Sequence, residues 1–298
     1  MNSPSVSLSM FRSAPKTTTE EDAPIDWLAE IRGLALMLLA VLGFHTFIAK
    51  PFYIPSESMM PNLLVGDRLV VSKYPYGWSW VSASFHVFPR SDWHIAPAVP
   101  EYGDIVIAVP PDRAEDYIKR VVALPGDRIA LKNGQIVLNG KPVPQDVVPD
   151  LRVAVDGNAP CNSGDYPGLK QEVGGAPVCE MPALRETMPN GASYVVVDHL
   201  RQRLDDMDEI TIPAGHVFLM GDNRDHSSDS RALAEPFDNG LGGPVPLTSV
   251  GGRAEFITFS LDGSLGWNPA TWWDALRPDR AWTSLRPSRV AGNDRDAE

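Results

Sequence analysis

The chain has 298 residues, 43% of them hydrophobic, which is enough for one large or two moderate domains with a proper core. Its 26 basic and 38 acidic residues give a net charge of −12, and no basic cluster is concentrated in the chain, so we expect no nucleic-acid partner. Two cysteines and six histidines, without HExxH or paired CxxC spacing, predict no metal site, and we expect no cofactor.

The N-terminal part of the chain has the composition of a tail followed by a membrane anchor. Residues 1–30 are rich in Ser, Thr, Pro and acids without apolar periodicity, which predicts a disordered cytoplasmic tail. Residues 33–49 form a 17-residue apolar run, polar only at His45 and Thr46, at the short end of what spans a bilayer as a helix. Interface-type residues flank the run, so we expect a transmembrane anchor over residues 31–50.

Two other interpretations of this run are a cleaved signal peptide and the buried helix of a soluble domain. The run is longer than a usual signal-peptide core and no A-x-A cleavage site follows it, which favours an uncleaved anchor. Arg12, Lys16 and Arg32 precede the run, while Lys50 and Lys73 follow it. This weak positive-inside bias predicts a cytoplasmic N-terminus.

The next segment, residues 51–67 (PFYIPSESMMPNLLVGD), holds two serines beside two methionines between prolines. Prolines fix φ and bias the preceding residues to extended backbone, so we expect a stiff, non-helical loop that can aim a hydroxyl. Ser58 is a candidate nucleophile there, although most loop serines are caps or turn formers. We expect Met59 and Met60 to be exposed, because thioether side chains suit a surface that meets lipid or an extended peptide.

Most of the remaining chain has the patterns of short strands and turns. Apolar and β-branched runs predict strands at residues 68–73, 104–109, 117–124, 194–197 and 216–220, and two Asn-Gly pairs predict a β-meander over 128–143. Residues 74–101 are expected to be a long loop whose aromatics lie in the core or at a membrane interface. Residues 144–192, rich in Pro and Gly, are expected to be mostly loop.

The predicted strand at residues 117–124 carries a lysine between apolar neighbours. A period of two places Lys119 on one face with Tyr117 and Val121, and residues 118, 120 and 122 on the other. Burial disfavours an ammonium group and lowers its pKa, and a neutral amine is what a Ser-Lys catalytic pair requires. The alternative is a surface lysine that snorkels to water.

A dense polar turn, GDNRDHSSDSR, occupies residues 221–231. Loops with this much hydrogen-bonding capacity, entered from an apolar strand, usually build a site or a turn scaffold. Asp229 and Arg231 are expected to form an ion pair, and Ser227 or Ser228 to hydrogen-bond a neutral amine. A calcium loop is the alternative, but the turn lacks the interior Gly and the terminal Glu of the EF-hand pattern.

Three segments, PSESMMPNLLVGD, GDIVIAVP…DYIKRVVALPGD and GDNRDHSSDSR, in this order after one apolar span, resemble the signature boxes of bacterial type I signal peptidases. The resemblance covers residues 53–77, 102–128 and 213–254, where GPVPLTSVGGRA at 243–254 is similar to the last box. It implies a mainly β fold: a membrane-anchored antiparallel β catalytic domain with an inserted β subdomain, preceded by one transmembrane helix. We therefore expect a periplasmic peptidase domain over residues 51–262 with its insert at 129–213, and a C-terminal tail over 263–298.

The resemblance also implies a function, a serine endopeptidase that removes N-terminal signal peptides from exported preproteins. Ser58 would be the nucleophile and Lys119 the general base, and Ser56 would supply a hydroxyl to the oxyanion hole beside the Ser58 amide. The implied location is the bacterial inner membrane, crossed once, with the catalytic domain in the periplasm. The implied partners are preproteins and the lipid bilayer, with proximity to the secretion translocon.

The polar turn has a supporting role in this resemblance. Ser227 would orient the lysine amine, and Asp229 with Arg231 would brace the loop. The chain departs from the family pattern at two positions: Glu57 stands where Gly is frequent, and His226 stands where Asn is common. The first bears on the flexibility of the nucleophile loop, and the second raises the question of a histidine base.

Two alternatives to a general signal peptidase remain open. One is a specialised pilus or conjugation maturation peptidase of the same family, which would share the dyad and differ in substrate range. The other is an inactive homologue that binds preproteins. The presence of both Ser58 and Lys119 argues against the inactive homologue, because a degenerate copy has no reason to retain both.

Two further features lie in the insert and the tail. Cys161 and Cys179, which we expect to lie away from the motif segments, would form a disulfide in an oxidising periplasm and close a loop that stabilises by ~3 kcal/mol. The C-terminal tail combines indole rings with guanidinium groups, a combination that suits contact with the lipid headgroup layer. The alternative is that the tail packs on the catalytic domain. The tail interleaves Trp267, Trp272, Trp273 and Trp282 with Arg277, Arg280, Arg286 and Arg289.

Overall fold

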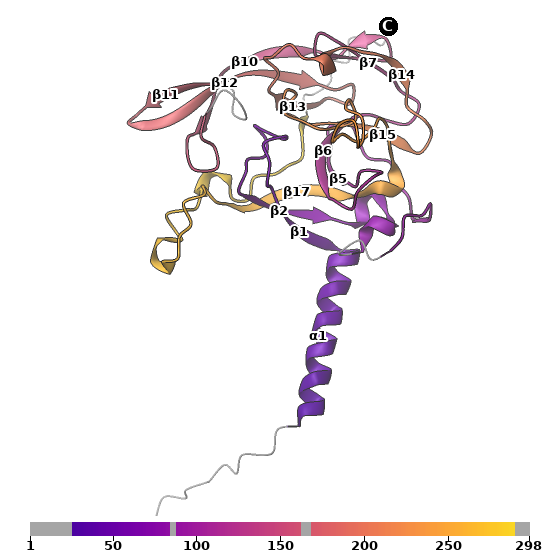
Figure 1. The fold of residues 1–298 in the computed structure, drawn as a ribbon, viewed down its shortest axis with the longest axis vertical. Helices are drawn as coiled ribbons and strands as arrows, with labels where there is room; N and C mark the ends of the chain where they lie inside the picture. Colours follow the sequence, from indigo (N-terminus) through magenta and orange to yellow (C-terminus); the bar gives the residue numbers. More distant parts are fainter. Residues whose placement is uncertain (1–25, 84–87, 162–167, 290–298) are drawn as a thin grey trace, which may run out of the picture. The chain divides into compact units, whose positions relative to one another are not determined.

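The computed structural model of the chain describes residues 26–83, 88–161 and 168–289. These described residues divide after Ala40 into two compact units, and each is described by itself. Figure 1 shows one long helix and, in the second unit, a set of antiparallel sheets. The expectation of a mainly β fold with one N-terminal apolar helix is confirmed.

Helix α1 (Trp27–Phe47) has 21 residues, none of them buried. Among the described residues it is the one helix long and apolar enough to cross a membrane, which is consistent with an anchor. Its first turn is capped by Asp26, whose Oδ1 accepts from the Leu28 and Ala29 amides at 3.1 and 3.2 Å. Residues 27–30 are therefore helical and not part of the expected tail, whose residues 1–25 lie outside the described part of the chain.

The main sheet of the second unit has seven strands among the described residues, in the order β1-β2-β17-β5-β6-β15-β16, and β1 pairs antiparallel with β2 at its edge (Figure 1). The C-terminal end of the expected anchor, residues 49–50, belongs to this sheet instead. The strands are β1 (Ala49–Tyr53), β2 (Asp67–Ser72), β5 (Ile105–Ala108), β6 (Tyr117–Ala123), β15 (His216–Met220), β16 (Val245–Pro246) and β17 (Val250–Ser260). The strand predictions at residues 68–73, 104–109, 117–124 and 216–220 are confirmed within one or two residues.

The insert contributes two more sheets. The predicted meander over 128–143 is confirmed as β7 (Arg128–Lys132), β8 (Gln135–Leu138) and β9 (Lys141–Pro142), with β14 (Met207–Thr211) on the other side of β7. A five-stranded sheet consists of β10 (Gln145–Ala154), β11 (Leu169–Val173), β12 (Ala176–Thr187), β13 (Ala192–Val196) and β18 (Ser288–Arg289).

The expectation of a mostly loop segment over residues 144–192 is wrong, because β10 and β12 are the longest pairing in the insert. The prolines, which indicated a loop, lie at positions of the β10–β12 pairing that do not require a backbone amide donor. The register shifts between Val148 and Leu151, and Pro149 and Pro182 lie at that irregularity. A bulge needs no regular amide donor, so proline does not disrupt the pairing there.

The segment over residues 74–101 is also not one long loop. It contains two short helical turns, η1 (Tyr74–Tyr76) and η2 (Trp80–Ser82), and the pair β3 (Trp78–Ser79) and β4 (His94–Ile95). Its aromatics divide between core and surface, since Tyr76 and Trp80 are buried while Phe88 and Trp93 are exposed. Phe85 lies outside the described residues.

The C-terminal segment packs on the domain for part of its length. β18 pairs with β13, and isolated bridges join Phe256 to Ser284 and Leu261 to Leu276. The boundary that we expected at residue 262 is therefore not a structural boundary, because residues 276–289 complete the domain.

Candidate active site

The loop between β1 and β2, residues 54–66, carries the candidate nucleophile and is closed at its base by backbone hydrogen bonds. The Ile54 amide donates to Asp67 O at 3.0 Å, and the Gly66 amide donates to Ile54 O at 3.1 Å. Ser58 lies within this loop and is buried, with 7% of its surface exposed. We call residues 54–66 the nucleophile loop.

The methionines beside Ser58 are fully buried, so the expectation of an exposed pair is wrong. Met59 packs with Leu63 in the core cluster below the main sheet, and Met60 packs with Leu64 and Cys179 in a cluster shared with the insert. The nucleophile loop lies between two parts of the core, and each thioether fills space in one of them. The adaptable shape of methionine explains why it suits both positions, but its contacts are with the protein core and not with lipid or a peptide.

Lys119 reaches the nucleophile loop from β6, and its Nζ donates to Ser58 Oγ at 2.9 Å. The lysine is 4% exposed and its Nζ lies 5.4 Å from the ring centroid of Tyr117, its expected neighbour on the same face. Burial lowers the pKa of Lys119 from 10.5 to about 8, and the nearby carboxylates of Asp229 and Asp222 oppose that shift. A buried amine of this kind can be neutral near physiological pH.

Ser56 is the second hydroxyl of the nucleophile loop. Its Oγ lies 3.5 Å from Ser58 Oγ, so the two hydroxyls share one small region of the site. The structure therefore brings together Ser56, Ser58 and Lys119 from the set of residues named by the motifs.

The polar turn over residues 221–231 is held by an internal ion pair. Asp229 accepts from the Gly221 amide at 2.9 Å and from Arg231 Nε at 2.9 Å. Arg231 Nη2 also donates to the carbonyl of Arg224 at 2.8 Å, across the turn. Both charged side chains are buried, and this network fixes the backbone of the turn.

The turn also contacts the nucleophile loop directly. The Asn223 amide donates to Ser58 O at 3.1 Å, and Asn223 Nδ2 donates to Glu57 O at 3.3 Å. A Cβ added to Gly221 would lie 2.2 Å from Ser227 Oγ and 2.5 Å from Ser58 O, so only glycine permits this approach.

The expected role of Ser227 at the lysine has no contact that supports it. Ser227 is 7% exposed, and its Oγ has no hydrogen-bond partner among the described residues. The close approach at Gly221 places the hydroxyl beside the Ser58 backbone instead. Ser228, the other candidate in this turn, is exposed.

Sequence reasoning missed a layer of buried ion pairs behind the site. Arg120, the β6 neighbour of Lys119, donates to Asp222 through Nε and Nη2, each at 2.6 Å. Arg224 donates to Glu186 of β12 at 2.8 Å. Asp222 and Arg224 belong to the polar turn and could have been found by asking what pairs with its charges, whereas nothing near Glu186 in the sequence indicates its partner.

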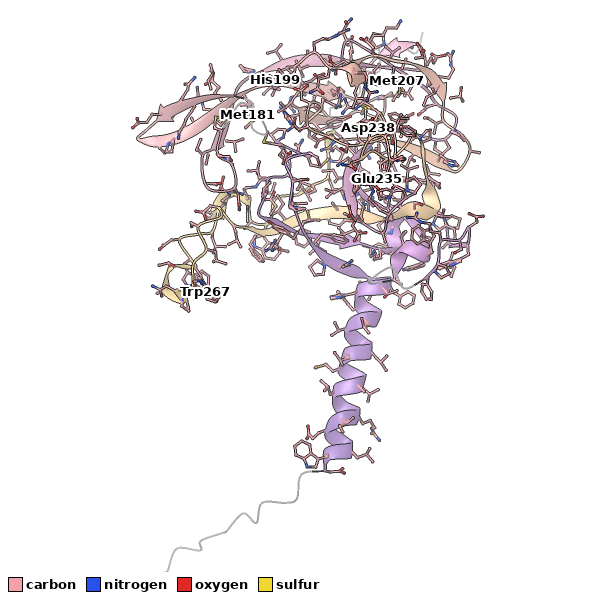
Figure 2. The ribbon with its side chains drawn as sticks, in the orientation of Figure 1. Met181, His199, Met207, Glu235, Asp238 and Trp267 are labelled. Carbon is pink, nitrogen blue, oxygen red and sulfur yellow. A yellow bond between two sulfur atoms is a disulfide. The ribbon has the colours of Figure 1, made fainter. Side chains whose placement is uncertain are left out.

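Two adjoining cavities flank the site. The first, which we call the nucleophile cavity, has a volume of about 400 Å³ and is lined by Ser58, Lys119 and apolar side chains of β1 and β6. The second, the outer cavity, has a volume of about 690 Å³ and includes the labelled residues Glu235 and Asp238 (Figure 2). His226, Ser228 and Asn239 line both cavities.

His226 makes no hydrogen bond to Ser58 through its Nε2 atom. Its Nε2 is buried without a hydrogen-bond partner in the described part of the chain, whereas Ser58 Oγ is hydrogen-bonded to Lys119. The described residues contain no group of three or more His, Cys, Asp or Glu side chains arranged to hold a metal ion.

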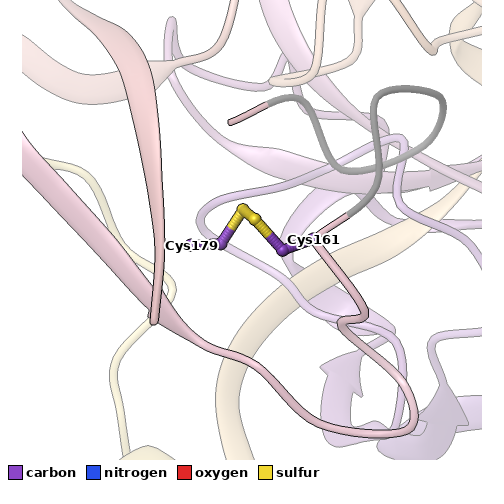
Figure 3. Close-up of a disulfide and its surroundings, with 2 residues drawn as sticks. All are labelled: Cys161 and Cys179. Carbon is purple, nitrogen blue, oxygen red and sulfur yellow. A yellow bond between two sulfur atoms is a disulfide. The ribbon is translucent and has the colours of Figure 1, made fainter. Parts of the chain in front are cut away.

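The two cysteines form a disulfide with an S–S distance of 2.05 Å, shown in Figure 3. They are not remote from the motif segments. Cys179 is fully buried and belongs to the same core cluster as Met60 and Leu64 of the nucleophile loop. The expectation that the pair lies away from the motifs is therefore wrong, because the insert folds back against that loop.

Comparison with known proteins gives the same family as the motifs. Residues 26–259 match the family described as signal peptidase, peptidase S26. The signal peptidase I of Rickettsia canadensis (strain McKiel) is 32% identical over an alignment of 271 residues that covers 87% of this chain and 86% of that protein. That of Pseudomonas aeruginosa is 34% identical over 227 residues, which are 75% of this chain and 69% of that protein.

A solved signal peptidase I from Enterococcus faecalis V583 is 21% identical and overlaps with a TM-score of 0.27, over 52% of this chain and 95% of that one. This overlap is too small to support a conclusion. The family match and the curated relatives are sufficient. The chain belongs to the signal peptidase family, peptidase S26, and is a peptidase, as its motifs predicted.

Proposed function

We propose that this signal peptidase removes N-terminal signal peptides from exported preproteins with a Ser58–Lys119 dyad. The observation that carries the proposal is the 2.9 Å contact between Lys119 Nζ and Ser58 Oγ, two side chains that are each more than nine-tenths buried. Burial keeps a fraction of the amine neutral, and a neutral amine accepts the serine proton.

The reaction proceeds in two halves. Ser58 Oγ attacks the carbonyl carbon of the last signal-peptide residue while its proton passes to Lys119 Nζ. The Lys119 ammonium then gives that proton to the leaving amine, so the peptide bond breaks and an ester with Ser58 remains. Water, deprotonated by Lys119, hydrolyses the ester and restores the serine.

The oxyanion of each tetrahedral intermediate needs donors beside Ser58. We assign this role to the Ser58 amide and the Ser56 hydroxyl, which the 3.5 Å separation of the two Oγ atoms supports. Loss of one such donor costs about 10²–10³ in rate. Asp229 and Arg231 act through the turn, by fixing the backbone that holds Ser58 O.

We further propose that α1 anchors the protein in the bacterial inner membrane with the peptidase domain in the periplasm, close to the translocon from which preproteins emerge. The length and apolar composition of α1 support the anchor. The disulfide supports an oxidising compartment for the domain.

The test uses full-length protein in detergent with a synthetic preprotein, and sequencing of the new N-terminus. We expect cleavage after the signal peptide by the wild type and by His226→Ala, and none by Ser58→Ala or Lys119→Ala at unchanged melting temperature. If His226→Ala were as inactive as Ser58→Ala, a Ser-His mechanism would replace the dyad.

A further inference from the structure

The outer cavity has no part in the dyad chemistry, yet it adjoins the site. It shares three wall residues, His226, Ser228 and Asn239, with the nucleophile cavity. Its volume of about 690 Å³ lies within the range of cavities that hold ligands, and is sufficient for several amino-acid residues. A peptide that lies extended past Ser58 in the nucleophile cavity would meet the outer cavity across these shared wall residues.

The two cavities differ in chemistry. Phe52, Ile54 and Ile118 make much of the nucleophile cavity apolar, whereas the outer cavity is lined mainly by polar and charged side chains. A signal peptide has an apolar core and ends in small residues, so the nucleophile cavity suits its end. The chain on the other side of the bond is the start of the mature protein, and the outer cavity is the space that remains for it.

A buried hydroxyl lies in the wall of the outer cavity. Ser227 lines the outer cavity, is 7% exposed, and has an Oγ without a partner among the described residues. The Gly221 contact places this hydroxyl beside the carbonyl of Ser58. An unpaired buried hydroxyl next to the nucleophile is a group that the backbone of a bound peptide would satisfy.

The walls of both cavities are rich in carboxylates. Asp225, Glu235 and Asp238 line the outer cavity, and three further carboxylates line the nucleophile cavity. Among the described residues, Lys119 is the single Lys or Arg along these walls. Arg113 approaches Glu235 at 3.5 Å but is also paired with Asp112 at 3.0 Å. Arg203 pairs with Asp238 at 3.0 Å, and His199 contacts Asp225 at 2.6 Å. Four carboxylates therefore face two guanidinium groups, and negative charge remains in excess there.

We propose that the outer cavity binds the first residues of the mature chain, and that its carboxylates favour neutral or basic residues over acidic ones at those positions. This inference rests on the proposed function. Phe237, 78% exposed beside Asp238, supplies an apolar surface for the same segment. Glu235 and Asp238 are the specificity-determining residues, because both lie at the cavity and neither contacts the dyad.

The experiment uses three synthetic peptides with one signal-peptide sequence and Lys, Gln or Glu at the second and third positions after the cleaved bond. Full-length protein in uncharged detergent cleaves each peptide, and kcat/KM is compared at low and high salt. We expect the Lys peptide to exceed the Glu peptide about fivefold at low salt, and the ratio to approach one at high salt.

The variant Glu235→Gln/Asp238→Asn tests the location of the effect. We expect its Lys-to-Glu ratio to fall close to one at low salt. The matched control is Asp208→Asn/Glu209→Gln on β14, which removes the same charge from exposed positions away from both cavities and should keep the wild-type ratio. The ratio is internal to each protein, so a partly unfolded preparation does not change it.

Each outcome decides one proposal. A wild-type ratio of one at low salt overturns the inference, and so does a raised ratio that survives in the double variant. If the wild type cleaves none of the three peptides, the proposed function fails instead, since the Gln peptide makes no demand on charge.

Discussion

In the proposed dyad, Lys119 is the residue whose environment sets the pH range of the reaction. Burial lowers its pKa to about 8, and the amine must be neutral to accept the serine proton. We therefore expect kcat/KM to rise with pH through a midpoint near 8 and then to level off. A profile that keeps rising toward the titration range of an exposed lysine would contradict the assignment.

The pKa of Lys119 also depends on Glu57, one of the two departures from the family pattern. Its carboxylate favours the ammonium form and raises the pKa of Lys119 against the larger effect of burial. We expect Glu57→Gln to move the midpoint of the kcat/KM profile to lower pH. Glu209→Gln, exposed on β14, is the control and should leave the midpoint unchanged.

At this scale, the sequence allowed the residues to be named but not their packing. The apolar neighbours of Lys119 predicted burial, and that is confirmed, because a period of two survives in any short strand. Met59 and Met60 were misplaced, since a loop between prolines gives no periodic signal for which side is covered. Ser227 was assigned a hydrogen bond that depends on angstrom-level geometry, which a motif does not specify.

The contact between the polar turn and the nucleophile loop depends on one glycine. Gly221→Ala would place a methyl group 2.2 Å from Ser227 Oγ and 2.5 Å from Ser58 O, so the loops must separate. Because misplacement of a nucleophile by about 1 Å can cost 10²-fold, we expect kcat to fall by about that factor. Steady-state kinetics checks this.

The control for that variant is Gly266→Ala, where no atom lies within 4 Å of the added methyl group and the backbone is unstrained. We expect its kinetics to match the wild type. Equal loss of kcat in both variants would show that the effect is not specific to the contact between the loops.

The disulfide joins elements of the insert beside the nucleophile loop. We expect Cys161→Ala/Cys179→Ala to lower the melting temperature by roughly 5–10 °C, because the unfolded chain gains the entropy of an opened loop. Activity well below the lowered melting temperature should persist, since neither sulfur contacts Ser58 or Lys119. Differential scanning calorimetry and peptide cleavage measure the two properties.

Free thiols found by mass spectrometry of alkylated, non-reduced wild-type protein would contradict the bond. Loss of activity in the double variant at 25 °C without unfolding would show that Cys179 also positions the nucleophile loop through Met60.

Among the elements, local pattern predicted the strands of the main sheet and the meander. It did not predict β10 and β12, because prolines usually indicate a loop. Here the prolines lie at a β-bulge, which the sequence does not reveal. Nor did it predict that Glu186 of β12 pairs with Arg224. That pair is 38 residues apart in sequence, and only the folding of the insert against the polar turn brings it together.

For the molecule as a whole, the C-terminal tail follows the alternative interpretation for part of its length, because it packs on the domain. Among its described residues, four arginines are each paired with a carboxylate of the domain. The pairs are Arg277 with Asp156, Arg280 with Asp67, Arg286 with Glu255, and Arg289 with Glu101. Truncation at residue 262 would leave Asp67, which is fully buried, without its arginine, and is therefore a poor test of membrane contact.

The exposed tryptophans of the tail are the remaining candidates for contact with the membrane. Trp267 and Trp273 are 102% and 79% exposed, and rings of this kind prefer the membrane interface. We expect Trp267→Ser/Trp273→Ser to lose a large part of the fluorescence quenching by brominated lipids that the reconstituted full-length protein shows. High salt should change the quenching little, because contact of indole rings with the interface is not an ionic interaction.

The comparison variant is Trp282→Phe, whose ring is 74% exposed but stacks on Phe256 of the domain with a centroid distance of 5.6 Å. It should change the quenching little. Equal quenching of wild type and Trp267→Ser/Trp273→Ser would leave the tail no contact with the membrane.

The direct passage from α1 into β1 also has a mechanical consequence. Only Ile48 separates the helix end at Phe47 from β1, and the nucleophile loop begins directly after β1 ends. Tension along α1 reaches the ladder between β1 and β2 before it reaches the nucleophile loop. That ladder joins five register pairs, from Ala49 with Ser72 to Tyr53 with Arg68, and its hydrogen bonds share the load. The ladder between β1 and β2 thus lies between α1 and Ser58 in the path of any tension along the chain.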